Sequence, residues 1–292
     1  MEKSTATIRT MMGKKNVALA LRCLGSVKAF TRRPLRFVVH DDGTLDDEDR
    51  ALLVEKLAPC DFQSRDAHGG RVEELLARYP RCGKFRNANL FGLKLFDVPL
   101  LSTDRAIYLD TDILFTRPLD IPAYFEGTPE AAFVCMEDIA ESYAPTIRMW
   151  PGLQRDGIVF TSRVCAGMIS LAASGLDLEF IEWFLGRDEE KNYLGVYPFW
   201  AEQTIYAALA ARGQCVYIDP RECRIAHART LPKDFTPAIL HFAGFQRPLL
   251  EKVFPEVDFS DTRPPLILKT SAAPHCTLSR RVYSALKKRF WL

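Results

Sequence analysis

The sequence has almost no excess charge of either sign. Lys and Arg number 39 against 37 Asp and Glu, which leaves a formal net charge of +2 over 292 residues. Binding to a nucleic-acid backbone normally depends on a clustered surplus of positive charge. The balance therefore gives no general reason to expect a nucleic-acid partner, and we predict none. Any affinity for anions must come from a local group of side chains.

Hallmarks of secreted, zinc-binding and membrane-spanning proteins are also missing. The eight cysteines include no C-x-x-C pair, so local spacing supports no thiolate metal site. No N-x-S/T sequon occurs, MEKSTATIRT lacks an apolar signal core, and no uncharged apolar stretch is long enough to cross a bilayer. Scattered cysteines, several of them inside apolar segments, favour a reducing compartment. We therefore expect a cytoplasmic protein.

What the sequence does contain is an alternation of helical and strand-like segments. Apolar residues at helical spacing predict helices at 16–30, 48–57, 72–79, 87–101 and 198–213. Short apolar runs predict strands at 35–40, 105–110, 164–173, 215–219 and 238–244. Thr44 and Asp47 have the spacing of a capping box before the second helix. The pattern predicts an α/β fold whose mainly parallel sheet is covered on both faces and binds ligands beyond the carboxyl ends of its strands.

Two carboxylates interrupt the apolar run AIYLDTDILF at 106–115. They are Asp110 and Asp112, with only Thr111 between them. On an extended strand alternate side chains face the same side, so both acids would face one point. A buried unpaired carboxylate is costly, and a divalent ion such as Mn²⁺ or Mg²⁺ removes that cost while it also holds the phosphates of a substrate. The alternative is a pair of solvated turn carboxylates.

The order of several motifs resembles the glycosyltransferases of the GT-A fold, most closely glycosyltransferase family 8, which includes glycogenin and bacterial lipopolysaccharide sugar transferases. The segment LKLFDVPLLSTDRAIYLDTDILFTRPLDIPAYF is similar to the family's Lys-Leu helix, its D-x-D strand and the short helix that follows. CAGMISL resembles the Asn-Ser/Ala-Gly strand, AEQTIYAAL the Asp-Gln-Asp helix start, and LHFAGFQRP the late His-Phe-x-Gly-x-x-Lys-Pro block. Ordered motifs of this kind are far more specific than one D-x-D.

The resemblance implies a GT-A fold with a Rossmann-like, mainly parallel central sheet flanked by helices. It implies a single catalytic domain over residues 1–250, in which 1–120 bind the nucleotide sugar and 121–250 bind the acceptor. Residues 251–292 would then be a C-terminal extension that ends in a basic amphipathic helix.

The resemblance also implies a metal site and its surroundings. Asp110, Asp112 and His241 would bind Mn²⁺ or Mg²⁺, although a histidine satisfied inside the sheet is the alternative for His241. Gly244 would let the backbone approach a phosphate closely. Arg247 replaces the family's lysine, and a guanidinium can bind a phosphate through two N–H groups.

Lys94 stands in the Lys-Leu motif, where the resemblance implies that it reaches the phosphate or sugar of the donor. A surface lysine on an amphipathic helix is the alternative.

The nucleotide would bind near the ends of the first strands. The first strand should end around TMMGKKN, which makes Thr10 and Met11 candidates for contact with the base and ribose. An acidic residue after the second strand would join them, and both Asp41 and Asp42 qualify. Thr111, between the two metal-binding acids, is a further candidate for donor contact.

Glu202 and Gln203 align with the family's Asp-Gln pair, one of which faces the reacting anomeric carbon. Because glutamate is longer than aspartate by a methylene, the role of Glu202 stays open, and an acid that favours a helix N-terminus is the alternative. Cys165 stands where the family has the asparagine that bonds the donor sugar, so the identity of the sugar is not predicted.

The expected reaction transfers a sugar from a nucleoside diphosphate sugar, which we predict to be a UDP-sugar, to a hydroxyl of a glycan, a lipid-linked acceptor or a protein. The resemblance implies retention at the anomeric carbon. Two alternatives stay open. One is a transferase-like protein that binds a nucleotide sugar or glycan without turnover. The other is a haloacid-dehalogenase-like phosphatase, which Leu114 and the preceding hundred residues or so of α/β pattern disfavour.

The end of the chain has its own pattern. In SRRVYSALKKRFWL, Val282, Tyr283, Leu286 and Phe290 share one helical face, and basic residues lie outside it. Such a helix can bind an anionic membrane surface, or it can dock on its own protein with its charges in solvent. We therefore expect peripheral membrane contact on the cytoplasmic face as one of two alternatives.

Overall fold

A computed structural model describes residues 5–291, apart from 90, 104, 122–124, 126, 127, 129 and 229–235. The side chains of 287–291 also lie outside the description. No helix in the described ranges is long and apolar enough to cross a membrane.

The strands form two sheets. In the described part of the chain, eight strands pair in the order β11-β8-β6-β7-β4-β1-β2-β3, and three pair in the order β5-β10-β9. Their bounds are β1 (Ala6–Met12), β2 (Leu35–Asp41), β3 (Cys60–Ser64), β4 (Ala106–Leu109), β5 (Ile113–Phe115), β6 (Phe133–Glu137), β7 (Val164–Leu171), β8 (Cys215–Ile218), β9 (Cys223–Ile225), β10 (Ile239–His241) and β11 (Thr270–Ala272). The sheet is parallel from β3 through β4, whereas β7 and β11 run antiparallel to their neighbours.

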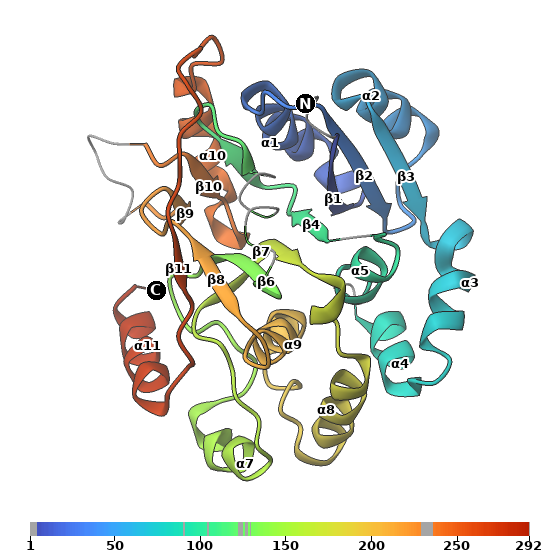
Figure 1. Cartoon of the computed structure of the whole chain (residues 1–292), viewed down its shortest axis with the longest axis vertical. Helices are drawn as coiled ribbons and strands as arrows, with labels where there is room; N and C mark the ends of the chain where they lie inside the picture. The colour runs from blue at the N-terminus through green and yellow to red at the C-terminus, as the bar shows by residue number, and fades with distance from the viewer. Residues whose placement is uncertain are drawn as a thin grey trace.

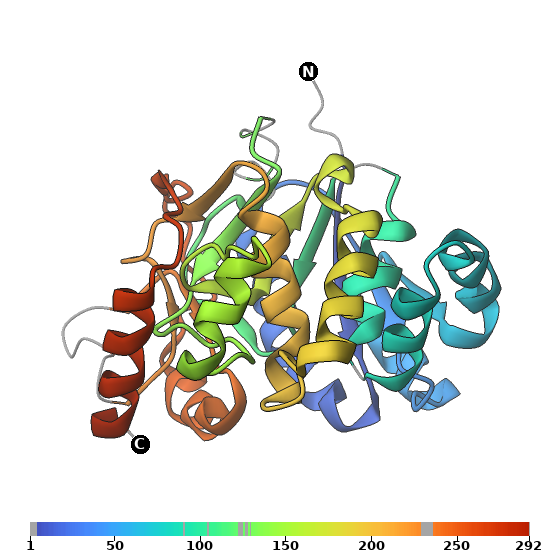
Figure 2. The ribbon, with the colours of Figure 1, turned by 90° about the horizontal axis from the view of Figure 1, so that it is seen from below.

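Helices cover both faces of the large sheet. The α-helices are α1 (Val17–Phe30), α2 (Asp47–Leu57), α3 (Arg65–Leu76), α4 (Pro80–Ala88), α5 (Val98–Leu100), α7 (Trp150–Arg155), α8 (Leu178–Lys191), α9 (Ala201–Ala210), α10 (Leu250–Val253) and α11 (Leu278–Trp291). Figure 1 shows the sheet between α1 and α2 on one side and α8 and α9 on the other, and Figure 2 shows α8 and α9 next to each other. The predicted α/β architecture is confirmed.

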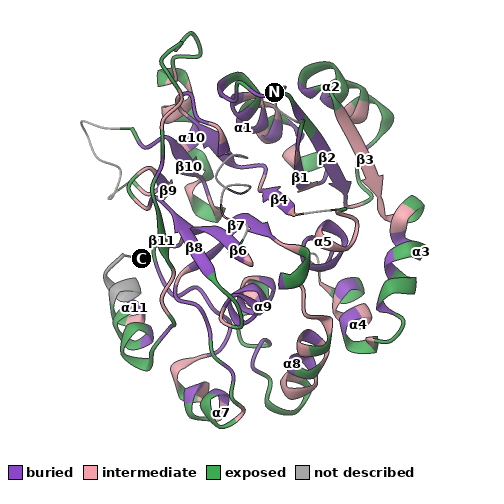
Figure 3. Ribbon diagram, in the orientation of Figure 1, coloured by how far each residue is buried: buried purple, intermediate pink, exposed green. Residues whose placement is uncertain are grey.

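Each face of the large sheet has its own hydrophobic core. On one face, Leu24 of α1 belongs to a buried cluster with Ile8 of β1. On the opposite face, Ile205 of α9 belongs to a second cluster with Tyr108 of β4. Figure 3 shows the central strands of the large sheet mostly buried, whereas the edge strands β3 and β11 are intermediate and exposed. With both faces covered, a ligand can reach these strands only at their ends, which is where the polar motifs lie.

Two local predictions need correction. The second helix begins at Asp47, and its capping box joins Asp46 and Asp49, not Thr44 and Asp47. A run of acidic residues offers several caps at the correct spacing, so the sequence did not select one.

The predicted helix over 87–101 is confirmed only in part. The chain leaves helical conformation after α4 ends at Ala88 and is helical again from Gly92 to Leu100, through the π-helix η2 (Leu93–Asp97) and α5. Gly92 explains the break. A Cβ at this residue would lie 2.5 Å from the Cα of Arg86, so the chain can approach α4 only with glycine here.

The buried pair of Arg86 and Asp97 fixes this break. Arg86 Nε and Nη2 donate to the two carboxylate oxygens of Asp97 at 2.6 and 2.7 Å, and both side chains are almost fully buried. A two-pronged contact of this kind sets the direction of η2, which carries Lys94 at its second position.

Substituting Arg86 with Met should lower the free energy of unfolding by about 3–5 kcal/mol, because it leaves the Asp97 carboxylate buried without its cation. Urea unfolding followed by circular dichroism measures the loss. Arg36→Met, which breaks the exposed pair with Asp61, is the matched control and should cost under about 1 kcal/mol. Equal losses in the two variants would contradict the role assigned to the buried pair.

The C-terminal segment contacts the body of the protein along much of its length. β11 pairs antiparallel with β8 at the edge of the large sheet. Further on, Arg281 of α11 donates to main-chain carbonyls of residues 141, 143 and 145. Between α10 and α11 the structure contains the 3-10 turn η7 (Phe254–Glu256) and the short strand β11 in an otherwise irregular course.

Candidate functional site

The two aspartates of the D-x-D motif lie in a turn after β4. The structure places Asp110, Thr111 and Asp112 between β4 and β5, and the turn is closed by the Ile113 N–H, which donates to the Asp110 carbonyl at 3.3 Å. The acids therefore converge because the chain reverses, and not because an extended strand continues through them. The Asp112 side chain is 4% exposed and that of Asp110 is 30% exposed, so the pair opens to solvent through Asp110.

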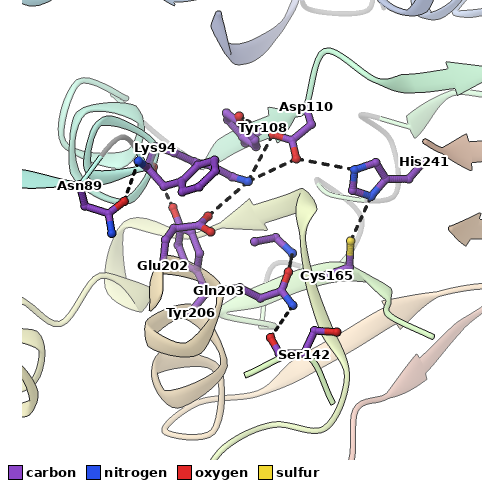
Figure 4. A network of polar contacts seen from close by, with 12 residues as sticks. Asn89, Lys94, Tyr108, Asp110, Ser142, Cys165, Glu202, Gln203, Tyr206 and His241 are labelled. Carbon is purple, nitrogen blue, oxygen red and sulfur yellow. Dashed lines mark hydrogen bonds and ion pairs between the residues drawn. The ribbon is translucent and has the colours of Figure 1, made fainter. Parts of the chain in front are cut away.

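His241, the last residue of β10, completes a cluster with the two aspartates. Its Nε2 lies 3.1 Å from Asp112 Oδ1 and 3.7 Å from Asp110 Oδ2. One ligand atom from each of the three residues falls within 4.8 Å of the others. The antiparallel pairing of β10 with β5 brings the histidine to the turn, since His241 is in register with Ile113. Figure 4 shows Asp110 and His241 directed toward each other.

These residues fit the divalent ion that the sequence predicts. Asp112 Oδ1 is buried, and among the described residues it lies 3.1 Å from His241 Nε2 as an ion-pair contact and has no other hydrogen-bond donor. Burial by itself raises the pKa of Asp112, but His241 and Arg247 outweigh it and hold the pKa below its ordinary value. Two carboxylates and an imidazole suit Mn²⁺, and they can also bind Mg²⁺.

Glycine at position 167 makes room for the histidine. A Cβ on Gly167 would lie 2.2 Å from Cε1 of His241, far inside van der Waals contact. Cys165, two residues earlier on β7, places its Sγ 3.3 Å from His241 Nδ1, the ring nitrogen away from the aspartates. β7 therefore sets where the imidazole lies as well as what faces its second nitrogen.

Lys94 is buried within the site and is not a surface lysine. Its Nζ lies 3.3 Å from Asp110 Oδ1 and 3.2 Å from Glu202 Oε1, and 4.6 Å from the centre of the Tyr108 ring. Burial by itself lowers the pKa of this lysine, but the attraction of the two carboxylates is larger and raises it above the ordinary value. Lys94 therefore stays charged beside Asp110.

A second cation borders the site on the other side. Arg247 of η6 (Gly244–Leu249) places Nε 3.0 Å from Asp112 Oδ2, and its side chain is 47% exposed. Gly244, the first residue of this turn, has φ of +54°, a conformation that side-chain-bearing residues rarely adopt. The glycine therefore turns the chain between His241 and Arg247.

Glu202 is held inside the protein at the start of α9. It is almost fully buried. Burial raises the pKa of Glu202, which the charge of Lys94 opposes. Tyr108 O–H donates to Asp110 Oδ1 at 2.6 Å, so Asp110 connects to Glu202 through Lys94 and to the sheet through Tyr108. Figure 4 shows this chain of contacts along one side of the site.

Both ends of the Gln203 amide are engaged. Its Oε1 accepts from the Ala166 N–H of β7 at 3.3 Å. Its Nε2 donates to Asp138 Oδ2 at 3.1 Å and to the Ser142 carbonyl at 2.9 Å. The orientation of this side chain is therefore fixed before any ligand arrives.

The residues predicted to contact the nucleotide lie along the neighbouring strands. Thr10 is buried in β1, and its hydroxyl has no hydrogen-bond partner among the described residues. Met11 is half-buried and packs against the hydrophobic cluster that contains Tyr108 of β4. Thr111 is buried within the D-x-D turn.

The two acids after β2 are engaged at that edge of the sheet. Asp41 is fully buried and pairs with Arg50 of α2 at 2.6 Å. Asp42 accepts from the N–H and hydroxyl of Thr44, and a Cβ on Gly13 would clash with it. The structure thus brings the predicted metal ligands together with Lys94 and Arg247, while Asp41 and Asp42 bond within the β1–β2–α2 edge.

Comparison with known proteins identifies the fold. No protein-family model and no curated protein sequence matches the chain. The galactosyltransferase LgtC, solved with donor and acceptor sugar analogues, superposes with a TM-score of 0.58 over 89% of this chain and 97% of its own, at 16% identity. Mouse xyloside xylosyltransferase 1 superposes with a TM-score of 0.51 over 82% and 98%, at 14% identity. The bifunctional glycosyltransferase WbbM gives 0.54 over 87% of this chain and 49% of its own, at 14% identity.

The chain has the GT-A glycosyltransferase fold. At this level of identity the similarity establishes the fold alone, so membership of family 8 stays a prediction. Within the GT-A fold, the Asp110–Asp112–His241 cluster lies where β4 ends beside β1, at the carboxyl edge of the parallel strands.

Three residues of the GT-A site escaped the sequence analysis. Gly167 was quoted within a motif but given no role, although a glycine inside a buried strand indicates close approach of another group. Asp138 carried no recognisable pattern, because it acts through Gln203, far away in the sequence. Tyr108 lies only two residues before its partner Asp110, but a tyrosine in an apolar strand is indistinguishable from an ordinary core residue.

Proposed function

We propose that the protein is a metal-dependent glycosyltransferase that moves a sugar from a nucleoside diphosphate sugar, a UDP-sugar, to a hydroxyl group. One observation carries the proposal. Two aspartates and a histidine, whose potential ligand atoms lie within 4.8 Å of one another, lie between two cations, Lys94 and Arg247, at the carboxyl edge of the parallel strands of a GT-A fold. The motif order that resembles family 8 supports retention at the anomeric carbon.

In this proposal, Asp110, Asp112 and His241 hold Mn²⁺ or Mg²⁺, which when bound supplies positive charge for the oxygens of the departing diphosphate. Arg247, partly exposed on the same side as Asp112, binds the same diphosphate through its guanidinium. Gly244 lets the backbone approach a phosphate, and Thr10, Met11, Thr111 and either Asp41 or Asp42 contribute to the nucleotide side. Fixed charges of this kind act without reorganising during the reaction.

The reacting sugar would lie over the start of α9. Gln203 presents an amide fixed at both ends, and Glu202 and Lys94 form a charged pair on the same side. We propose that these three side chains orient the donor sugar toward the acceptor hydroxyl. Positioning of this kind can account for a large share of the rate of a transfer reaction.

We further propose a glycan, lipid-linked or protein acceptor and a cytoplasmic location, with the acceptor side built from residues 121–250. All eight cysteines are free thiols, which supports a reducing compartment.

We also propose peripheral membrane contact through the outer face of α11. Val282, Tyr283 and Leu286 are exposed there, Tyr283 at 67%. Co-sedimentation with vesicles that contain anionic lipid tests this contact, and protein left in the supernatant at low salt would contradict it.

The experiment that tests the function is incubation with Mn²⁺ or Mg²⁺ and UDP-, GDP- and dTDP-sugars, with and without a mixture of glycan and lipid-linked acceptors. A transferase releases the nucleoside diphosphate only when the ion is present. Release of inorganic phosphate would indicate a phosphatase, although the GT-A fold and the position of the D-x-D turn after an internal strand argue against that class. Ion-dependent binding of a nucleotide sugar without release would indicate a protein that binds and does not catalyse.

A further inference from the structure

An irregular loop, residues 138–145, lies between the active-site helix α9 and the C-terminal helix α11. On the α9 side it makes three hydrogen bonds. Gln203 Nε2 donates to Asp138 Oδ2 and to the Ser142 carbonyl, and the Ala144 N–H donates to Thr204 Oγ1 at 2.8 Å. The loop therefore contacts two successive residues of the helix that carries the candidate catalytic amide.

The same loop is bound on its other side by α11. The Arg281 guanidinium donates to the carbonyls of Glu141 and Tyr143, the latter at 2.9 Å, and to that of Pro145. Ser284, one turn further along α11, accepts from the Glu141 N–H at 2.8 Å. Arg281 and Ser284 are 8% and 6% exposed, which shows that this polar side of α11 is the side that docks.

The Glu141 side chain ties the loop to the start of β7. Its two carboxylate oxygens accept from the Ser162 hydroxyl and the Arg163 N–H, at 2.5 and 2.9 Å. Farther along the loop, Tyr143 O–H contacts the Thr161 carbonyl and accepts from the Val164 N–H. The side chains of Glu141 and Tyr143 thus anchor the loop to residues 161–164, whereas the carbonyls of residues 141, 143 and 145 receive their hydrogen bonds from Arg281.

We infer that Arg281 is a positioning residue that acts on Gln203 through the loop, and that α11 is thereby part of the catalytic unit. This inference rests on the proposed function for its kinetic consequence. The loop has no regular hydrogen-bonding pattern of its own, so the conformation that presents Asp138 Oδ2 and the Ser142 carbonyl to Gln203 is set by the groups on either side. A fork of N–H groups that binds three carbonyls fixes it in a way that a lysine cannot copy.

Arg281 would affect the reaction through the position of the Gln203 side chain. When Arg281 is removed, the carbonyls of residues 141, 143 and 145 lose a charged donor and the loop relaxes. Gln203 then keeps the Ala166 N–H but loses a fixed acceptor for its other end. A displacement of about 1 Å in a positioning group can reduce turnover by about 100-fold.

Hydrogen–deuterium exchange of the full chain tests the coupling without reference to activity. In Arg281→Met, the amides of Glu141 and Ala144 should exchange about tenfold faster or more, while those of β1 and β2 are unchanged. The matched control is Arg280→Met, which removes the neighbouring guanidinium, whose recorded contact is with Ser162 Oγ at 3.3 Å. If Arg281→Met does not fold, Ser284→Ala, which removes a single bond, should show a smaller rise at Glu141. Unchanged exchange would overturn the inference, whatever the protein catalyses.

Steady-state kinetics with the donor identified for the wild type test the consequence. Arg281→Met should lower kcat by about tenfold to 100-fold with little change in the donor KM. In a Gln203→Ala background the same change should have almost no further effect, because the group through which Arg281 acts is gone. Losses that multiply in the double variant would overturn the inference. A wild type with no turnover on any donor would refute the proposed function, and the exchange experiment would still decide the coupling.

Discussion

Replacing Asp112 by asparagine should abolish ion-dependent binding of the donor and reduce turnover by about 100- to 1000-fold, the loss expected when one charge-stabilising group is removed. The change keeps the size of the side chain and removes only its negative charge. Oδ1 of Asp112 is buried and accepts no hydrogen bond from the described residues, so it is an oxygen that a cation would satisfy. Titration calorimetry with Mn²⁺ and a thermal-shift assay with Mn²⁺ and nucleotide measure the effect.

The control for this variant is Asp61→Asn, which removes a carboxylate from an exposed ion pair with Arg36 at the far edge of the sheet. It should leave ion and donor binding unchanged. If Asp112→Asn kept ion-dependent stabilisation by the nucleotide at the wild-type level, the metal site, and the transferase proposal with it, would be refuted.

The variant Gly167→Ala should be nearly as damaging, although alanine at this position touches neither ion nor donor. The added methyl group would occupy space held by the His241 ring, 2.2 Å from Cε1, so either the imidazole or β7 must move. Overfilling a packed site costs about 1–3 kcal/mol of stability. The larger expected effect is a loss of about 100-fold in affinity for the ion, since a ligand that is displaced no longer faces the two aspartates.

Gly83→Ala on α4 is the control, since a Cβ there meets nothing within 4 Å. Alanine in an open helical position should be neutral or stabilise by about 0.4–1 kcal/mol. Mn²⁺ affinity and urea unfolding measured on both variants separate a local effect at His241 from general destabilisation. Wild-type Mn²⁺ affinity in Gly167→Ala would show that His241 tolerates the methyl group and does not need its observed position.

Much of this site could be predicted from the sequence because its residues carry their own chemical meaning. Two acids after an apolar strand demand a counter-charge. His241 was predicted from the motif order that resembles family 8, and the structure places it beside the two acids, while its role as a third ligand stays a prediction. The placement of the acids in a turn was not predictable in the same way, because an apolar run on both sides of Asp110 and Asp112 is compatible with one continuous strand or with two.

The break of the chain around Gly92 escaped prediction for a different reason. Helical periodicity continues through residues 87–101, and only the close approach to Arg86 shows why the helix cannot. The burial of Lys94 follows from that break, since the π-helix η2 directs it inward. Long-range contact therefore decided both its surroundings and its charge partners.

The tail shows a limit of reading a helix by hydrophobicity. For a tail docked on its own protein, the pattern in 279–292 predicts that the apolar face with Val282, Tyr283 and Leu286 packs and that the charges lie in solvent. The structure docks Arg281 and Ser284 instead and leaves those three residues exposed. Buried carbonyls of the loop without a hydrogen bond would cost more free energy than the exposure of these apolar side chains. The sequence of the helix alone does not show that those carbonyls lie beside it.

The two cations that flank the aspartates have a consequence for the resting protein. Lys94 already pairs with Asp110 and Glu202, and Arg247 already pairs with Asp112, so part of the negative charge of the site is compensated by the chain itself. A bound ion would therefore replace part of the pairing that Lys94 and Arg247 already provide to the carboxylates of Asp110 and Asp112. If the protein acts as the proposed metal-dependent transferase, we therefore expect the ion to enter and leave the site without unfolding of the surrounding strands.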